Sequence, residues 1–367
     1  MRWQVNFDEL PDLALSPNVV FSINKDSLQR GEPLDLEVAI QNVSKVDLDS
    51  FPVAFRILRA NNQIDEIVRV EMPPLKADSI AICKVSIPTG NYTGRNTLLI
   101  EVNPEQLQEE IHAFNNFGQF EFFVRVDNLT PLLDVTFDGR KIMNRDIVSS
   151  TPQIDIALRD NNSFMTLDDT SAFAIYITAP NQPEELLNYG LNPSYELKFM
   201  PASTAENKAM AQFNPKLEQD GIYRLRIQAK DKSGNEAGEQ DYRVEFEVIN
   251  KTAVTHLLNY PNPFSTSTRF VFTLTGNQIP DQIQIQIMTI TGKVVREIDQ
   301  FELGPLHIGN NITEFAWDGK DMFGDQLANG VYLYRVKMRI NGTDVERRNT
   351  NIDQYFTREF GKMYLLR

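Results

Sequence analysis

The sequence predicts an all-β protein made of three consecutive immunoglobulin-like β-sandwich domains. Short runs of alternating or β-branched residues, bounded by Gly, Pro, Asn and Asp, recur about every 8–12 residues, as the strands of sandwiches do. Helical periodicity is nearly absent. At 367 residues the chain is too long for one ordinary domain and long enough for several separate cores. We therefore expect domains at 1–127, 128–250 and 251–367.

The composition is that of a folded, acidic protein. It is 41% hydrophobic and 23% charged, which is a normal globular mixture. Its formal net charge of -14 repels nucleic-acid phosphates and anionic lipids, so neither is expected as a partner. No apolar run is long enough to cross a bilayer, and the N-terminus lacks the pattern of a signal peptide. We expect any export signal to lie outside this sequence.

The first domain is expected to contain seven strands. In the second strand, apolar residues at 34, 36, 38 and 40 alternate with more polar ones, which buries one face of the pleat. The segment 103–114 is the one place where a helical turn or two is expected, with Leu107, Ile111 and Phe114 on one side. The seven expected strands lie at 19–23, 34–44, 51–60, 64–73, 79–88, 96–104 and 120–127.

The second and third domains follow the same alternation. In the second, strands are expected at 154–158, 223–231 and 242–248, with a Gly- and Asn-containing turn at 230–238. In the third, Ile283, Ile285 and Ile287 should face one way. The expected strands of the third domain lie at 269–276, 283–298, 311–317, 330–340 and 362–367.

The first domain resembles the CARDB family, a bacterial immunoglobulin-like module of cell-surface proteins. The resemblance lies in "GEPLDLEVAIQNVSK" and in "LLIEVNPEQLQEEIHAFNNFGQFEFFV", where Asn115 and Asn116 precede the final strand. We expect the Asn116 amide to satisfy loop backbone groups and to tolerate left-handed φ.

The third domain resembles the FlgD-like immunoglobulin domain and the C-terminal sorting domain of type IX secretion cargo in Bacteroidetes. Four segments carry the resemblance: "NYPNPFSTSTRFVFTL", "IMTITGKVVREI", "WDGKDMFGDQLANGVYLYRV" and "GKMYLLR". Prolines stiffen the first segment, so Tyr260 and Phe264 are expected to pack as plugs at the end of the sandwich. The motif residues are Tyr260, Pro261, Pro263, Phe264, Gly292, Trp317, Asp318, Gly319, Gly324, Gly330, Tyr332 and Lys362.

This resemblance implies a non-catalytic C-terminal portion of an exported protein, located outside the cell or on its outer surface. The implied partners are translocon and shuttle proteins of the outer membrane, recognised through exposed backbone at a sheet edge and through the terminal "KMYLLR". We expect a monomer whose first two domains act as spacers or adhesion modules. The segment 137–173 is similar to one that follows gingipain-like (C25) peptidase regions, so any catalytic domain would precede Met1.

Candidate chemistry within the sequence is sparse. His112, His256 and His307 lie far apart, and Cys83 sits in an alternating strand as a small apolar residue. No pair of His or Cys has zinc-ligand spacing, and no cofactor is expected. Oxygen ligands that suit Ca²⁺ gather in one loop. These candidate calcium ligands are Asp160, Asn162, Asp168 and Asp169.

Two alternatives stay open. The first two domains could bind a surface glycan or a protein, with exposed aromatics such as Tyr355 and Phe356 as further candidates. They could also be accessory domains of an upstream cysteine peptidase.

Overall fold

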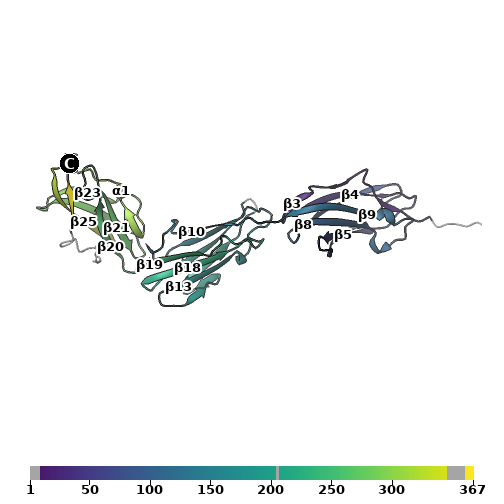
Figure 1. Cartoon of the computed structure of the whole chain (residues 1–367), viewed down its shortest axis with the longest axis horizontal. Helices are drawn as coiled ribbons and strands as arrows, with labels where there is room; N and C mark the ends of the chain where they lie inside the picture. Colours follow the sequence, from purple (N-terminus) through teal and green to yellow (C-terminus); the bar gives the residue numbers. More distant parts are fainter. Residues whose placement is uncertain (1–8, 204–205, 345–359) are drawn as a thin grey trace, which may run out of the picture.

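The computed structural model describes residues 9–203, 206–344 and 360–367, and it confirms the all-β fold class. Within these residues, six sheets form three sandwiches that follow one another along an extended molecule (Figure 1). Each sandwich has its own cluster of buried apolar side chains. None of the described helices has the length and apolar character needed to cross a bilayer.

The first sandwich is built around β4, which pairs with β7 along one side and with β1 and β2 in succession along the other. The facing sheet has the order β3-β9-β8-β5-β6. The strands are β1 (Leu13–Leu15), β2 (Phe21–Ile23), β3 (Ser27–Gln29), β4 (Leu34–Asn42), β5 (Phe51–Arg59), β6 (Ile64–Met72), β7 (Ile80–Ile87), β8 (Gly94–Val102) and β9 (Phe117–Arg125).

Two expectations for the loop before β9 are wrong. Only short 3₁₀ turns form, at Pro104–Gln106 and Phe114–Asn116, and the apolar side chains at 107, 111 and 114 are exposed. Asn116 is buried, but its Nδ2 donates to the carboxylate of Glu110 (2.9 Å), not to loop backbone. A hydrogen bond to the half-buried carboxylate of Glu110 therefore replaces the local role that the sequence suggested.

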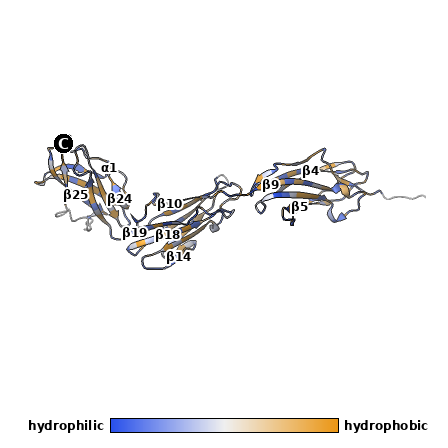
Figure 2. Ribbon diagram, viewed as in Figure 1, coloured by the Kyte–Doolittle hydropathy of each residue, from blue (hydrophilic) through white to orange (hydrophobic). Residues whose placement is uncertain are grey.

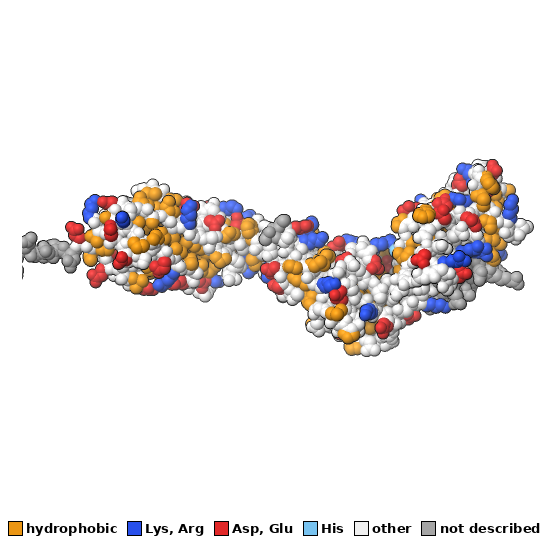
Figure 3. Space-filling model, turned by 180° about the vertical axis from the view of Figure 1, so that it is seen from behind, with side chains coloured by type: hydrophobic (Ala, Val, Ile, Leu, Met, Phe, Trp, Pro, Cys, Tyr) orange, Lys and Arg blue, Asp and Glu red, His pale blue; other side chains and the backbone are white. Residues whose placement is uncertain are grey.

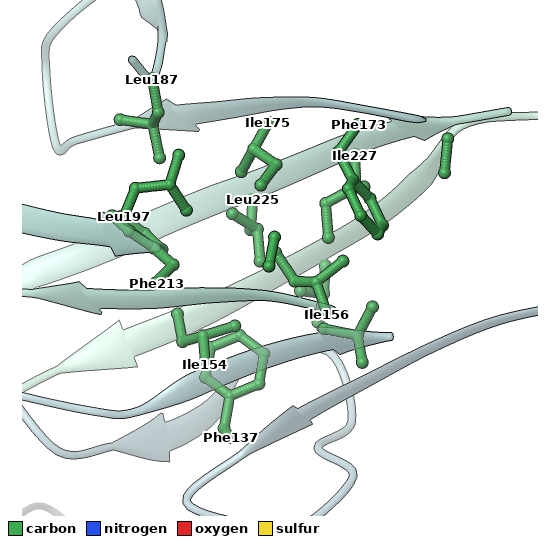
Figure 4. Packing of buried hydrophobic residues seen from close by; sticks show 14 of the residues in the cluster. Phe137, Ile154, Ile156, Phe173, Ile175, Leu187, Leu197, Phe213, Leu225 and Ile227 are labelled. Carbon is green, nitrogen blue, oxygen red and sulfur yellow. The ribbon is translucent and has the colours of Figure 1, made fainter. Parts of the chain in front are cut away.

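The second sandwich consists of two five-stranded sheets, ordered β10-β12-β17-β16-β15 and β11-β19-β18-β13-β14. Its core interleaves side chains from both sheets, such as Ile154 and Phe213 from one and Leu225 from the other (Figure 4). Each such side chain contributes roughly 1.5–3 kcal/mol on burial. The strands are β10 (Leu132–Phe137), β11 (Asp146–Val148), β12 (Ile154–Arg159), β13 (Phe173–Thr178), β14 (Glu184–Leu186), β15 (Gly190–Asn192), β16 (Tyr195–Met200), β17 (Lys208–Pro215), β18 (Gly221–Ala229) and β19 (Tyr242–Val248).

The third sandwich packs the sheet β20-β21-β24 against a sheet ordered β23-β22-β25-β26, with β27 also paired to β25. Ile283, Ile285 and Ile287 are buried together, as their alternation predicted. A one-turn helix, α1 (Gln300–Leu303), is capped by Asp299. The strands are β20 (Ala253–Tyr260), β21 (Arg269–Thr275), β22 (Gln282–Thr289), β23 (Val294–Ile298), β24 (Gly309–Ile312), β25 (Gly330–Ile340), β26 (Thr343–Asp344) and β27 (Gly361–Leu365).

The surface agrees with the alternation in the sequence. Apolar and polar residues alternate along strands such as β18, and basic and acidic side chains are interspersed over the visible face (Figures 2 and 3). Because polar residues occupy the outward positions of the pleats, each sandwich buries only its inner faces.

Candidate functional site

Segments that are far apart in the sequence meet around Trp317 in the third sandwich. Trp317 is 1% exposed, and its ring centroid lies 5.5 Å from that of Phe264 and 5.9 Å from that of Tyr332. Its indole Nε1 donates to the carbonyl of Lys320 (2.8 Å). The aromatic contacts add to the stabilisation that burial alone provides. Two of the four motif segments are thus joined through one aromatic cluster.

The terminal segment joins the same cluster as strand β27. This strand runs antiparallel to the first half of β25, with Leu365 opposite Gly330 and Gly361 opposite Tyr334. Met363 and Leu365 are fully buried in the core of the sandwich. The last residues of the chain are therefore part of the fold and contribute to its stability.

The outer edge of β27 is covered by the proline-containing segment. Asn262 Nδ2 donates to the carbonyl of Lys362 and its Oδ1 accepts from the amide of Tyr364, both at 3.0 Å. The amide of Phe264 donates to the carbonyl of Tyr364 (3.0 Å), and the carbonyl of Phe264 accepts from the amide of Leu366 (2.9 Å). Contrary to the expectation of an exposed sheet edge here, this backbone is not free to pair with another chain.

The C-terminal residue is also fixed. The amide of Arg367 donates to Asn329 Oδ1 (3.0 Å), its carbonyl accepts from Asn329 Nδ2 (3.1 Å), and its guanidinium donates to the carbonyl of Asp318 (2.5 Å). A Cβ at Gly319 would lie 2.9 Å from that guanidinium and 3.0 Å from the Leu365 side chain, and Gly319 has φ +75°. The positive φ favours glycine there, and a larger residue would also crowd the side chains of Leu365 and Arg367. We call this assembly of Asn262, Phe264, Trp317, Asn329 and residues 361–367 the terminal-strand site.

Several side chains in and beside the terminal-strand site face solvent. Tyr364 is 43% exposed and Leu366 is 54% exposed, and Lys362 is exposed as well. Tyr260 is 73% exposed, so the prediction that it packs as a plug is wrong, whereas Phe264 is buried as predicted. A partner that approaches this end of the strand would meet these side chains, because the backbone is already bonded.

The remaining motif residues have local roles. The Tyr260–Pro261 and Asn262–Pro263 peptides are cis. Gly292 and Gly324 lie in turns, where their amides donate to the carbonyls of Thr289 and Asp321. Gly330 opens β25.

The histidines and the cysteine lie apart. His112 is in the first sandwich, where its Nδ1 contacts the carboxylate of Asp12 at 2.9 Å. His256 lies in β20, and His307 precedes β24. Cys83 is buried in β7, and burial raises the pKa of its thiol to about 11. Cys83 is therefore held as a thiol at neutral pH.

The predicted calcium ligands separate into two groups. Asp168 and Asp169 both form ion pairs with Lys232 Nζ, at 2.5 and 2.7 Å. The hydrogen bonds of Lys232 and Ser171 lower the pKa of Asp169 to about 2. Asn162 Oδ1 accepts hydrogen bonds from the backbone amides of Phe164 and Met165 in its own loop. Only Asp160 enters a cluster of carboxylates, so the four residues do not form one site.

The carboxylate cluster consists of Asp127, Asp160 and Asp231. One ligand oxygen from each can be chosen so that all three lie within 4.8 Å of one another. Asp160 and Asp231 are 5% and 4% exposed. In the part of the chain that the structure describes, no Lys, Arg or His forms an ion pair with any of the three. These residues could hold a hard cation such as Ca²⁺, which prefers carboxylate oxygens.

Burial and the neighbouring carboxylates raise the pKa of Asp160. Loss of solvation is the main cause that raises the pKa of Asp160 to about 6, and the charges of Asp127 and Asp231 raise it further. The backbone amide of Asn161 partly opposes this shift by donating to Asp160 Oδ1 at 2.7 Å. A divalent cation would remove the repulsion by neutralising the charge.

Sequence reasoning missed Asp127 and Asp231. Asp160 is the first residue after β12, and Asp127 and Asp231 are the second residues after β9 and β18. An acidic residue one or two positions after a strand was thus the available signal. It is weak, because the register of strands in different domains decides which strand ends meet.

A separate cavity of about 410 Å³ opens on the second sandwich. Its lining combines apolar residues such as Leu133 and Tyr242 with polar ones such as Gln228 and Gln240. It is a place where a small polar ligand would fit by volume. The aromatic candidates Tyr355 and Phe356 lie outside the described residues.

No protein-family model and no curated protein matches this sequence. Among solved structures, the CARDB domain of a Pyrococcus furiosus protein in complex with di-metal ions is 19% identical, with a TM-score of 0.27. That match covers 33% of this chain and 100% of the other.

Two further structures are similar to a comparable degree. Dimeric latent PorU from Porphyromonas gingivalis is 16% identical with a TM-score of 0.26, and the match covers 98% of this chain and 34% of PorU. A β-glucosidase from Listeria innocua is 16% identical with a TM-score of 0.23, over 32% of this chain and 16% of the other. The chain thus spans about a third of the PorU structure. These scores are too low to assign a family or an activity.

Proposed function

We propose that this chain is the non-catalytic C-terminal portion of an exported bacterial surface protein. In this proposal the third sandwich is the sorting domain that directs type IX secretion and surface attachment. The first two sandwiches hold the exported part away from the attachment point, or take part in adhesion. The implied partners are the translocon and shuttle proteins of the outer membrane.

One observation carries this proposal: motif residues that resemble a sorting domain form a single structural unit with the end of the chain. The segment around Asn262 and Phe264 covers the outer edge of β27, while Asp318 and Asn329 hold Arg367. Such an arrangement presents the side chains of Lys362, Tyr364 and Leu366 on a fixed backbone. A fixed surface loses less conformational entropy when a partner binds it.

The test is surface delivery in a bacterium that has a type IX system. The full chain, preceded by a signal peptide, is expected to reach the cell surface, where added protease can digest it. Deletion of residues 362–367 should leave the protein in the periplasm. Normal surface delivery of that deletion would contradict the proposal.

Point variants separate recognition from folding. The deletion also removes the buried Met363 and Leu365, so it destabilises the domain. The double variant Tyr364→Ala, Leu366→Ala removes only exposed or half-exposed side chains, and we expect it to fold yet accumulate in the periplasm. The matched control is Phe301→Ala, which removes a 95% exposed aromatic side chain outside the four motif segments and should be delivered normally.

We infer a second candidate function, binding of Ca²⁺, from the carboxylate cluster. The specific observation is that two nearly buried carboxylates and a third carboxylate converge without an ion-pair partner among the described residues. In this proposal the bound cation would join a residue at the end of the first sandwich to two residues of the second. Equilibrium dialysis against Ca²⁺ at neutral pH tests it, and absence of bound Ca²⁺ would exclude it.

A further inference from the structure

The first two sandwiches meet at a narrow neck, where β9 ends and a short connection leads to β10 (Figures 1 and 3). Domains joined by a short connection are expected to move relative to one another unless specific contacts hold them. The hydrogen bonds at this neck therefore decide whether the pair is hinged or rigid.

Asp127, at the end of the first sandwich, is bonded to two separate loops of the second. Its Oδ2 accepts from Asn162 Nδ2 and from Ser233 Oγ, both at 3.1 Å. Its backbone carbonyl accepts from Asn235 Nδ2, also at 3.1 Å. The two loops follow β12 and β18, which belong to different sheets. Asp127 is thus held from both layers of the second sandwich.

The turn between β3 and β4 provides a second attachment point. The carbonyl of Arg30 accepts from Asn162 Nδ2 (3.0 Å), and its guanidinium donates to the carbonyl of Ser233 (3.5 Å) and to that of Gly90 (2.9 Å). Asn162 is 3% exposed and accepts backbone amides of its own loop with Oδ1. Because this side chain is fixed on both sides, it links two points of the first sandwich to one rigid loop.

Close packing completes the contact. Met165 lies against Gly31, where an added Cβ would come within 2.9 Å of its Sδ and 3.1 Å of the carbonyl of Phe164. Gly31 has φ +86°, which disfavours other residues as well. The apolar side chain of Met165 therefore packs against the first sandwich, and bending at the junction would break this contact.

We propose that the first two sandwiches form one rigid unit, fixed by Asp127, Asn162, Asn235 and the packing of Met165 on Gly31. Contacts that come from both sheets of the second sandwich restrict rotation about the connection as well as bending. The unit would present its far end in a constant direction. This inference does not depend on the sorting role of the third sandwich.

Distance measurements between two spin labels on the full chain test the proposal. The labels are placed on cysteines introduced at the exposed positions Glu121, in β9, and Lys208, in β17. The native Cys83 is 1% exposed and should stay unlabelled. The wild-type pair is expected to give one narrow distance distribution. A broad or multiple distribution would overturn the proposal without recourse to any variant.

Variants then identify what fixes the angle. Asp127→Ala combined with Asn235→Ala should at least double the width of the distribution, and Asn162→Ala should broaden it too. Asn161→Ala is the matched control, because the neighbouring Asn161 is exposed and its side chain forms no hydrogen bond among the described residues. If the folded double variant kept the narrow distribution, these residues would not be what holds the two sandwiches rigid.

Backbone variants provide an independent check. Gly31→Ala and Gly139→Ala both place a Cβ at positive φ, +86° and +75°, but only the Cβ at position 31 would meet the other sandwich, since nothing lies within 4 Å of a Cβ at position 139. We expect Gly31→Ala to shift or broaden the distance distribution and Gly139→Ala to leave it unchanged. Equal effects of the two would contradict a role for the Gly31 contact.

Discussion

The terminal-strand site and the junction between the first two sandwiches are held by different forces. In the terminal-strand site, apolar side chains such as Trp317 and Leu365 are buried, and backbone hydrogen bonds close the edge of β27. At the junction, Asp127 accepts hydrogen bonds from the second sandwich. Its carboxylate also lies close to those of Asp160 and Asp231, and like charges repel. The terminal-strand site should therefore be insensitive to pH and cations, whereas the junction should respond to both.

Trp317→Ala should have the largest effect. It removes a fully buried aromatic side chain that contacts Phe264 and Tyr332. The free energy of unfolding of the third sandwich should therefore fall by about 3–5 kcal/mol. Calorimetry should show earlier melting of one domain, with the other two unchanged. Phe323→Ala, at an exposed site, is the control and should have little effect. A small loss for Trp317→Ala would mean that the terminal-strand site does not depend on apolar burial.

Calcium should stabilise the junction and leave the terminal-strand site unchanged. At a free Ca²⁺ concentration roughly a hundred times Kd, linkage gives about 3 kcal/mol. Hydrogen exchange should slow in the loops that carry Asp160 and Asp231, and EDTA should reverse this. Asp231→Asn is expected to abolish the response, whereas Asp168→Asn, which removes a carboxylate paired with Lys232, should keep it. Slower exchange in β27 as well would erase the contrast between the two regions.

The pH dependence of the junction has a defined sign. The folded pKa of Asp160 is raised to about 6 from the ordinary 3.8, so ionisation costs more in the folded state. The penalty is absent below pH 3.8, grows as the pH rises, and is complete above about 6. In the absence of Ca²⁺, Asp160→Asn should therefore increase stability at pH 7 by about 1–2 kcal/mol, because weakening of the hydrogen bonds that Asn161 and Asn207 donate to this carboxylate offsets part of the gain.

Measurement of unfolding at several pH values checks this sign. The difference between Asp160→Asn and wild type should vanish near pH 4. Asp169 gives the opposite behaviour, because Lys232 lowers its pKa to about 2 and its stabilisation is lost as the pH falls from 3.8 through 2. If Asp160→Asn destabilised the protein equally at all pH values, its carboxylate would act only through hydrogen bonds.

Asn262→Ala should have the smallest effect on stability, and the effect should be confined to β27. It removes two hydrogen bonds to β27, each worth about 0.5–1.5 kcal/mol when buried and less at this exposed position. The amide of Tyr364 should exchange faster, while exchange in β22 should stay unchanged. Asn277→Ala, at an exposed position, is the matched control. Unchanged protection at Tyr364 would show that pairing with β25 alone holds the terminal strand.

The sequence by itself determined the fold class and most of the buried faces. The alternation at 283–287 and in β18 placed apolar residues inside without reference to any other segment, because burial with a period of two is a local property of a strand. The resemblance of the third domain was also readable from short segments, although their joint contact around Trp317 was not.

Only the tertiary structure decided which loop residues meet. Asp160 was predicted as a ligand, but its neighbours Asp127 and Asp231 lie 33 and 71 positions away in the sequence, and Asp168 and Asp169 pair with Lys232 instead. Likewise, nothing in "YPNPF" indicates that Asn262 closes the edge of β27 while Tyr260 stays exposed. Such contacts depend on strand order and register across whole domains, which local alternation does not specify.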